Sequence, residues 1–191
     1  MEMLNLYRCK MERYFRVLIV IIVGLLQNNP SSAYDFMVND LYYNILQDKD
    51  NEVELTSYVL RGSNQYSEYT VIDIPQEVTY SNILYKVTAI SDEAFGQCTN
   101  ITSVKIPVSV KSIGNRAFQD CHSLESITLP NSLTILNEGI FDGCYKLSSI
   151  SIPNSIRIIG VDAFHNCEKL KLINLPSNLT RIEHDAFSYC I

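Results

Sequence analysis

The strongest constraint on the fold is a unit of 23 residues that the chain writes four times between Ile101 and Cys190. In order, the units are ITSVKIPVSVKSIGNRAFQDC, LESITLPNSLTILNEGIFDGC, LSSISIPNSIRIIGVDAFHNC and LKLINLPSNLTRIEHDAFSYC. Proline, phenylalanine and cysteine each form a column that keeps this step of 23 residues. A fixed period of about 20–50 residues is typical of solenoids, in which neighbouring repeats share one continuous core. The sequence therefore predicts a stack of similar coils.

The apolar residues within one unit predict how a coil closes. In the second unit, Ile127 and Leu129 are two residues apart and so face the same side of a short strand. Pro130 follows, and its missing N–H ends the ladder of that strand. We expect a second extended piece over residues 133–136 and either a helical turn or a bend around Phe141.

The N-terminal residues 1–33 have the pattern of a secretory signal peptide. Basic residues between Arg8 and Arg16 precede the apolar run VLIVIIVGLL, and Ser31, Ser32 and Ala33 offer a cleavage site. The apolar run is about half of the ~20 residues that a membrane span needs, so a signal anchor is the weaker interpretation. The sequence therefore predicts a secreted or cell-surface protein without a membrane span in the mature chain.

Residues 34–71 are predicted to form a cap of short strands. Phe36, Val38 and Leu41 begin an alternation of apolar and polar residues that continues toward Ile74, with turn-forming clusters between the runs. This pattern favours three or four short antiparallel strands. A solenoid has to cover the apolar end of its first coil, so an N-terminal cap is the natural role for this segment. The alternative, a small separate domain, is weaker because about 40 residues enclose little core.

Residues 72–191 are assigned to the repeats, of which the first is atypical. Ile74 and Pro75 match the later units, yet Phe95 follows Pro75 by 20 residues, whereas Phe118 follows Pro107 by 11. The extra residues lie within QEVTYSNILYK, which we expect to form a hairpin beside the solenoid. The sequence stops one residue after Cys190 with no segment suited to a C-terminal cap, so we expect the cap to be missing from a longer array.

The repeat resembles the leucine-rich repeat of the BspA-like family of surface proteins. The phrases IPQEVTYSNILYKVTAISDEAFGQC and ITLPNSLTILNEGIFDGC carry the resemblance, and YDFMVNDLYYNIL is similar to the start of mature members. The resemblance implies a leucine-rich-repeat solenoid, a right-handed β/α superhelix that is rich in strand, has short helical turns and begins with a β-strand cap. It also implies a secreted or surface protein, with adhesion to host or matrix proteins for some bacterial members. The chain departs from the family pattern at Ile140, where alanine is usual, and at Asn137 and Glu183, where glycine is usual.

Charge and motifs exclude several classes of function. The chain carries −6 overall, and residues 34–191 hold 11 basic and 19 acidic residues, a net charge of −8 that would repel nucleic-acid phosphates. The chain contains no catalytic or phosphate-binding motif of the common types. His122, His165 and His184 occupy three different phases of the repeat and are expected to be solvent-facing turn residues. We therefore predict no enzyme activity and no cofactor.

The five periodic cysteines, from Cys98 to Cys190, allow two interpretations. Secretion would permit disulfides, and equivalent Cα atoms of adjacent coils should lie about 4.8 Å apart, within disulfide range. Parallel side chains also keep their Cβ atoms about 4.8 Å apart, however, which exceeds the ~3.8 Å that a disulfide prefers. A buried column of reduced cysteines is the favoured interpretation. A zinc site is not indicated, because the spacing is the repeat period and no C-x-x-C pair occurs.

The outward positions of the first strand are the candidate site for a partner. One column comprises Lys105, Thr128, Ser151 and Asn174, and its neighbour comprises Ser103, Ser126, Ser149 and Leu172. Small polar side chains in register would make a flat surface able to hydrogen-bond a protein ligand. Simple solvation of the strand explains the same residues, and the columns contain no aromatic anchor. Two sequons, at Asn100 and Asn178, would accept glycans in a eukaryotic secretory pathway.

The sequence therefore predicts a secreted or cell-surface protein that mediates protein–protein interaction or adhesion to host or matrix proteins. Its oligomeric state is left open. Two alternatives remain: a structural spacer of a surface layer with no partner of its own, and a carbohydrate-binding module. The latter would need exposed aromatic residues at a fixed phase, and only Tyr66, Tyr69, Tyr80 and Tyr85 cluster near the first coil.

Overall fold

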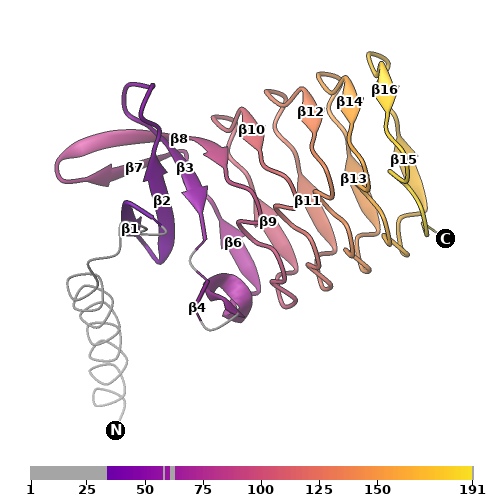
Figure 1. Cartoon of the computed structure of the whole chain (residues 1–191), viewed down its shortest axis with the longest axis horizontal. Helices are drawn as coiled ribbons and strands as arrows, with labels where there is room; N and C mark the ends of the chain where they lie inside the picture. Colours follow the sequence, from indigo (N-terminus) through magenta and orange to yellow (C-terminus); the bar gives the residue numbers. More distant parts are fainter. Residues whose placement is uncertain (1–33, 58, 61–62, 191) are drawn as a thin grey trace, which may run out of the picture. The chain divides into compact units, whose positions relative to one another are not determined.

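The computed structural model describes residues 34–57, 59–60 and 63–190 as a stack of coils joined to a group of N-terminal strands (Figure 1). The predicted signal peptide, residues 1–33, lies outside the described residues.

One side of the coils is a five-stranded parallel sheet, called the strand face here. Its strands are β6 (Val71–Asp73), β9 (Ser103–Lys105), β11 (Ser126–Thr128), β13 (Ser149–Ser151) and β15 (Leu172–Asn174), which lie side by side in chain order. Pairing joins equivalent residues of successive coils, as with Ser126 between Ser103 and Ser149. The central residue of β9, β11 and β13 is buried and its neighbours point outward, as the alternation in sequence predicts.

A second side of the coils is built from shorter strands and is interrupted once. It contains β10 (Ser112–Ile113), β12 (Ile135–Leu136), β14 (Ile158–Ile159) and β16 (Arg181–Ile182). β12, β14 and β16 form one parallel sheet, while β10 pairs with β8 (Ile83–Ile90) of the preceding coil. Within the part of the chain that the structure describes, no ladder joins β10 to β12.

The third side of each coil contains the phenylalanine and is a hydrogen-bonded turn. Residues two before and two after each phenylalanine have positive φ, as at Arg116 and Asp120 around Phe118 (53° and 57°). These left-handed residues prevent a helix from continuing, so the segment is a pair of hydrogen-bonded turns, in which Gln119 N donates to Arg116 O and Cys121 N donates to Phe118 O. Backbone N–H groups here donate to the following coil, for example Phe118 N to Ile140 O at 3.1 Å.

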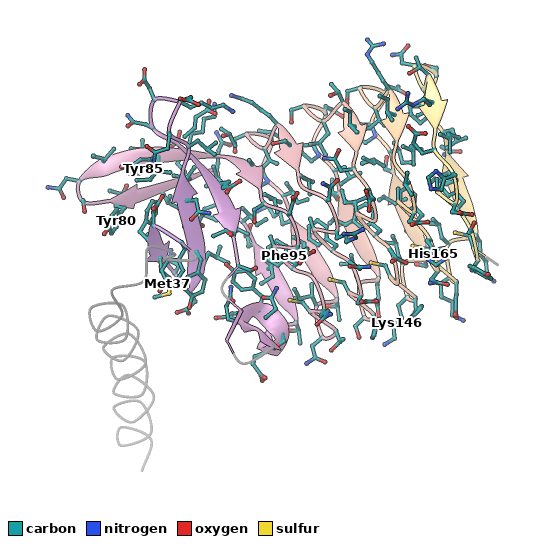
Figure 2. The ribbon with its side chains drawn as sticks, in the orientation of Figure 1. Met37, Tyr80, Tyr85, Phe95, Lys146 and His165 are labelled. Atoms are coloured by element: carbon teal, nitrogen blue, oxygen red, sulfur yellow. The ribbon has the colours of Figure 1, made fainter. Side chains whose placement is uncertain are left out.

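The N-terminal strands form a meander that joins the first coil. β1 (Phe36–Val38), β2 (Leu41–Ile45) and β3 (Glu52–Thr56) pair antiparallel, and β3 then lies parallel to β8. The extra residues of the first coil form the expected hairpin, with β7 (Glu77–Tyr80) antiparallel to β8. Figure 2 labels Tyr80 and Tyr85 on this hairpin.

The prediction of three or four short antiparallel strands in this segment holds for β1, β2 and β3 but was wrong for β6. It belongs to the parallel strand face, because Ile72 and Ile74 occupy the same phase as Val104 and Ile106 of the next coil. Between β3 and β6, β4 (Val59–Leu60) pairs with β5 (Ser63–Asn64), and a 3-10 helix, η1, spans Gln65–Glu68.

The core runs through the coils as a stack of aromatic rings. Phe95, Phe118, Phe141 and Phe164 are fully buried, and their adjacent centroids lie 5.2, 5.6 and 5.4 Å apart. Tyr66 of η1 continues the stack 5.1 Å from Phe95, and its hydroxyl donates to the carbonyl of Thr56 at 2.8 Å. That hydroxyl also accepts from the N–H of Tyr42 at 2.9 Å, so one buried side chain links the core to the N-terminal strands.

Candidate interaction surface

The predicted candidate residues lie together on the strand face. Parallel register aligns Ser103, Ser126, Ser149 and Leu172 in one column, and Lys105, Thr128, Ser151 and Asn174 in the other. In the second column all four side chains are exposed, and in the first the side chains of Ser126 and Ser149 are exposed and that of Ser103 is half-buried. From β9 to β13 the two columns therefore form the continuous polar surface that the repeat period predicts. Whether a partner binds there stays a prediction.

The structure adds one strand to this surface that the sequence argument left out. β6 continues the two columns with Val71, which is 59% exposed, and Asp73. The phrase Ile72-Asp73-Ile74-Pro75 matches Val104-Lys105-Ile106-Pro107, so the same alignment would have found both residues. Nζ of Lys105 lies 3.4 Å from Oδ2 of Asp73, with both side chains well exposed, and this pair holds the only charges in the two columns.

The five periodic cysteines are free thiols, as the favoured interpretation predicted. Four are buried, and each thiol from Cys121 to Cys190 donates to the carbonyl of the phenylalanine in the preceding coil at 3.2 Å. Burial raises the pKa of Cys98 to about 12 and raises those of Cys121, Cys144 and Cys167 as well. Protonated thiols of this kind are poor nucleophiles and poor metal ligands.

His165 is less exposed than a solvent-facing turn residue. Its Nδ1 lies 2.8 Å from Oδ1 of Asp142, which occupies the same phase one coil earlier, and Oδ2 of Asp142 accepts from Nε2 of Gln119 at 3.0 Å. The histidines were predicted not to meet one another, but the aligned column Gln119, Asp142, His165 was missed. Reading down that single phase would have shown a donor, an acid and a histidine in successive coils.

The other two histidines are more exposed. His122 stacks on Tyr145 with centroids 4.7 Å apart, and His184 is exposed as predicted. Exposed aromatic rings are present at Tyr145 and Tyr189, but they occupy different phases of the repeat and neither lies on the strand face. These two rings therefore do not form the row of exposed aromatic residues at a fixed phase that a carbohydrate-binding module would need.

Both sequons serve contacts between coils. The amide of Asn100 donates to the carbonyl of Ser67 at 3.0 Å, and that of Asn178 donates to the carbonyl of Asn154 at 3.1 Å. Their threonines, Thr102 and Thr180, donate in the same way to carbonyls of the preceding coil. These hydrogen bonds give the sequons a structural role whether or not they carry a glycan.

Two further properties of the described residues bear on function. No cluster of histidine, cysteine, aspartate or glutamate side chains in that part of the chain has the make-up of a metal site. Within the same ranges, no helix has both the length and the apolar character needed to cross a membrane.

Comparison with solved structures identifies similar solenoids. A leucine-rich-repeat protein from Bacteroides ovatus is 34% identical, with a TM-score of 0.68 over 78% of this chain and 37% of that one. The Treponema leucine-rich-repeat protein TpLRR (T. pallidum) is 27% identical, with a TM-score of 0.67 over 81% of this chain and 66% of that one. The chain thus spans little more than a third of the first protein and just under two thirds of the second.

The pneumococcal vaccine antigen PcpA shares the fold, with a TM-score of 0.63 at 23% identity, over 81% of this chain and 42% of that one. No curated protein matches the sequence significantly.

The family model of the BspA type leucine rich repeat region matches six copies over residues 65–191. This match covers more than half of the chain and confirms the resemblance drawn from the repeat unit. The match begins at the 3-10 helix and includes the first coil with its hairpin. The chain belongs to the BspA-type leucine-rich-repeat family.

Proposed function

We propose that this protein is a secreted or cell-surface binding module that uses its strand face to hold a protein partner, such as a host or matrix protein. The observation that carries the proposal is the regular, mostly small and polar set of outward side chains along β9, β11 and β13, which Asn174 of β15 continues. Leucine-rich repeats typically form extended surfaces for protein interactions.

The chemistry of the strand face favours a protein over a nucleic acid or a membrane. Its side chains are mostly hydroxyls and an amide, each able to donate and accept hydrogen bonds. The surface has no deep anchor, so binding would come from many modest contacts, and repeated display on a cell surface would raise the overall avidity. A net charge of −8 over residues 34–191 adds repulsion toward phosphate-rich partners.

Two structural roles belong to the same proposal. We propose that β1, β2 and β3 cap the first coil, because Tyr66 and Thr56 link the aromatic stack to these strands through a buried hydrogen bond. We also propose a right-handed superhelix, since connections between parallel strands of one sheet are right-handed in about 98% of cases. The predicted boundaries, residues 34–71 for the cap and 72–191 for the repeats, remain part of this proposal.

A charge-reversal experiment tests the strand face. The variant combines Lys105→Glu, Thr128→Glu, Ser151→Glu and Asn174→Glu, and binding is measured by biolayer interferometry against purified matrix proteins and host-cell surfaces. We expect the wild-type chain to bind one of these saturably, and the variant to lose at least about tenfold in affinity, because burying four unpaired carboxylates and losing the hydrogen bonds of the native side chains both oppose contact.

A matched control changes the same residue types elsewhere. It combines Asn131→Glu, Thr134→Glu, Lys146→Glu and Ser177→Glu, all at exposed positions outside the strand face; Figure 2 shows Lys146 at the edge of the coils. The control should bind like the wild type. Equal losses in both variants would contradict the proposal, and a complete lack of binding by the wild type would favour the structural spacer. Circular dichroism checks that both variants fold.

A further inference from the structure

A second site lies away from the strand face, at the junction between the N-terminal strands and the coils. A cavity of about 520 Å³, open to solvent at Asp92 and Ser112, is bounded by β3, the end of β8, β10 and one residue of the following coil. Its polar lining includes Glu54 and Thr56 from β3, Ser91 and Asp92 from the turn after β8, Ser112 from β10, and Asn137. These residues come from four separate stretches of chain and converge on one space.

The cavity lies where the second side of the coils is interrupted. At the phase of Asn137, Gly114 and Gly160 donate from their backbone N–H to the preceding coil, at 2.9 and 2.7 Å. A Cβ on Gly114 would lie 2.3 Å from Oδ1 of Asp92, so that coil packs too closely for a side chain. Glu183 at the same phase also donates from its backbone N–H, at 2.9 Å, whereas Asn137 donates to Ile113 O from its side-chain Nδ2, at 2.6 Å. Between β10 and β12, a side-chain hydrogen bond thus stands where a backbone ladder joins the later coils.

The cavity carries negative charge that the described residues leave uncompensated. Oε1 of Glu54 accepts from the amide of Asn44 at 3.2 Å, and Oδ1 of Asp92 accepts from the N–H of Asn115 at 2.7 Å. Neither carboxylate forms an ion pair with any residue that the structure describes. Lys111, beside Ser112 in sequence, is held instead by Glu52, with Nζ 2.7 Å from Oε1.

Size and chemistry restrict what would neutralise this charge. The volume is more than ten times the ~30 Å³ that one water occupies in the liquid, which is far more than a bare ion needs. A guanidinium group is planar, keeps its charge, and presents five N–H donors to carboxylate and hydroxyl oxygens. Its alkyl stem would find apolar contact at Ala89, since the side chains of Ile90 and Ile113 are buried in the core and line the cavity only through their backbone.

We propose that this cavity is a binding site for an arginine side chain of a partner protein. The two carboxylates receive the guanidinium, the hydroxyls of Thr56, Ser91 and Ser112 accept its remaining hydrogens, and Ala89 contacts its stem. This site goes beyond the strand-face proposal and does not depend on it, since no residue of the strand face lines the cavity.

A short peptide tests the site directly. The probe is acetyl-Gly-Arg-Gly-amide, and its neutral counterpart carries citrulline, which has the same shape without the charge. In ¹⁵N–¹H NMR titrations of the chain, we expect the arginine peptide to shift the amides of Ser91, Asp92, Gly114 and Asn137 saturably, with a dissociation constant of about 1 mM. The citrulline peptide should bind at least about tenfold more weakly, because charge-assisted hydrogen bonds are lost.

Two double variants that remove the same charge test whether the carboxylates of the cavity bind the arginine peptide. Glu54→Gln with Asp92→Asn should weaken the arginine peptide at least about tenfold, whereas Glu125→Gln with Glu168→Gln removes the same charge from exposed positions outside the cavity and should leave the affinity unchanged. Glu54→Gln alone should still weaken binding about threefold. Because it keeps the hydrogen bond between Asp92 and Asn115, it still tests the proposal if the double variant misfolds.

Three outcomes would overturn the proposal: no saturable shift at these amides, equal binding of both peptides, or full binding by the folded cavity variant. The strand-face variant with four glutamates should bind the peptide normally, so failure of one proposal is distinguishable from failure of the other.

Discussion

Raising the pH from about 8 to about 11 is expected to unfold this protein under conditions in which its thiols stay reduced. The reason is the column of buried cysteines, in which burial raises the pKa of Cys98 from 9.0 to about 12 and raises those of Cys121, Cys144 and Cys167 further above the ordinary value. The unfolded chain loses these protons near pH 9, while the folded chain retains them. Stability is therefore complete below pH 9 and falls as the pH rises toward the folded pKa values.

The expected effect is large because the four groups act together. Each buried thiol lowers the free energy of unfolding by up to about 1.4 kcal/mol per pH unit once the unfolded chain is deprotonated. Four such groups give up to about 5–6 kcal/mol per unit, against a typical total stability of about 5–15 kcal/mol. Above pH 10 the buried hydroxyls of Tyr43 and Tyr66 act in the same direction, since burial raises the pKa of both.

Urea unfolding at a series of pH values, in the presence of a reductant, measures this slope. The combined variant Cys121→Ala, Cys144→Ala is less stable at neutral pH. Above pH 9 its free energy of unfolding should fall less steeply with pH than that of the wild type, because the contribution of two thiols to the slope is gone. That comparison removes the general repulsion that any acidic protein develops in base. A slope unchanged by the double substitution would show that the thiols do not cause the alkaline loss.

Phe141→Ala is expected to lower the free energy of unfolding by about 3–5 kcal/mol. The ring is fully buried and lies between Phe118 and Phe164, with centroids 5.6 and 5.4 Å away. Its removal leaves a cavity in the middle of the stack and also ends two ring contacts, which contribute about 0.5–1.5 kcal/mol each. Urea denaturation followed by circular dichroism at neutral pH would measure the loss.

The matched control is Phe187→Ala at the same phase of another coil. Phe187 is half-buried and its ring stacks on that of Phe164 at 5.2 Å. We expect at most about half the loss seen at Phe141, because less surface is buried and one described ring contact disappears. Equal losses at the two positions would mean that the continuous stack does not determine the stability of a coil.

The regular part of this fold is predictable because one rule is repeated. Ile127, Leu129 and Phe141 recur at a step of 23 residues, so any interpretation that buries them in one coil buries their equivalents in every coil. The polar columns of the strand face follow from the same step, since residues beside a buried strand position point outward. The hairpin in the first coil was predictable because its extra residues break the period of 23.

The features that sequence reasoning missed depend on contacts between coils at single positions. Asn137 was recognised as a departure from glycine, but only the structure shows that its side chain takes over a backbone hydrogen bond. The pair of Asp142 and His165 needs two unlike residues at one phase to be read together. The cavity beside Asn137 involves β3, whose parallel pairing with β8 has no signal in either strand alone.

The interruption between β10 and β12 makes this junction the place where we expect the array to bend most easily. Backbone hydrogen bonds fasten these two coils along the strand face and along the phenylalanine turns, as at Arg116 N and Glu138 O. On the second side, the described hydrogen bonds between these two coils come from the side chains of Ser132 and Asn137. Because the two coils are joined by backbone hydrogen bonds on two sides and only by side chains on the second side, they bend most easily toward and away from the second side. We expect an array under tension to change curvature at this junction first.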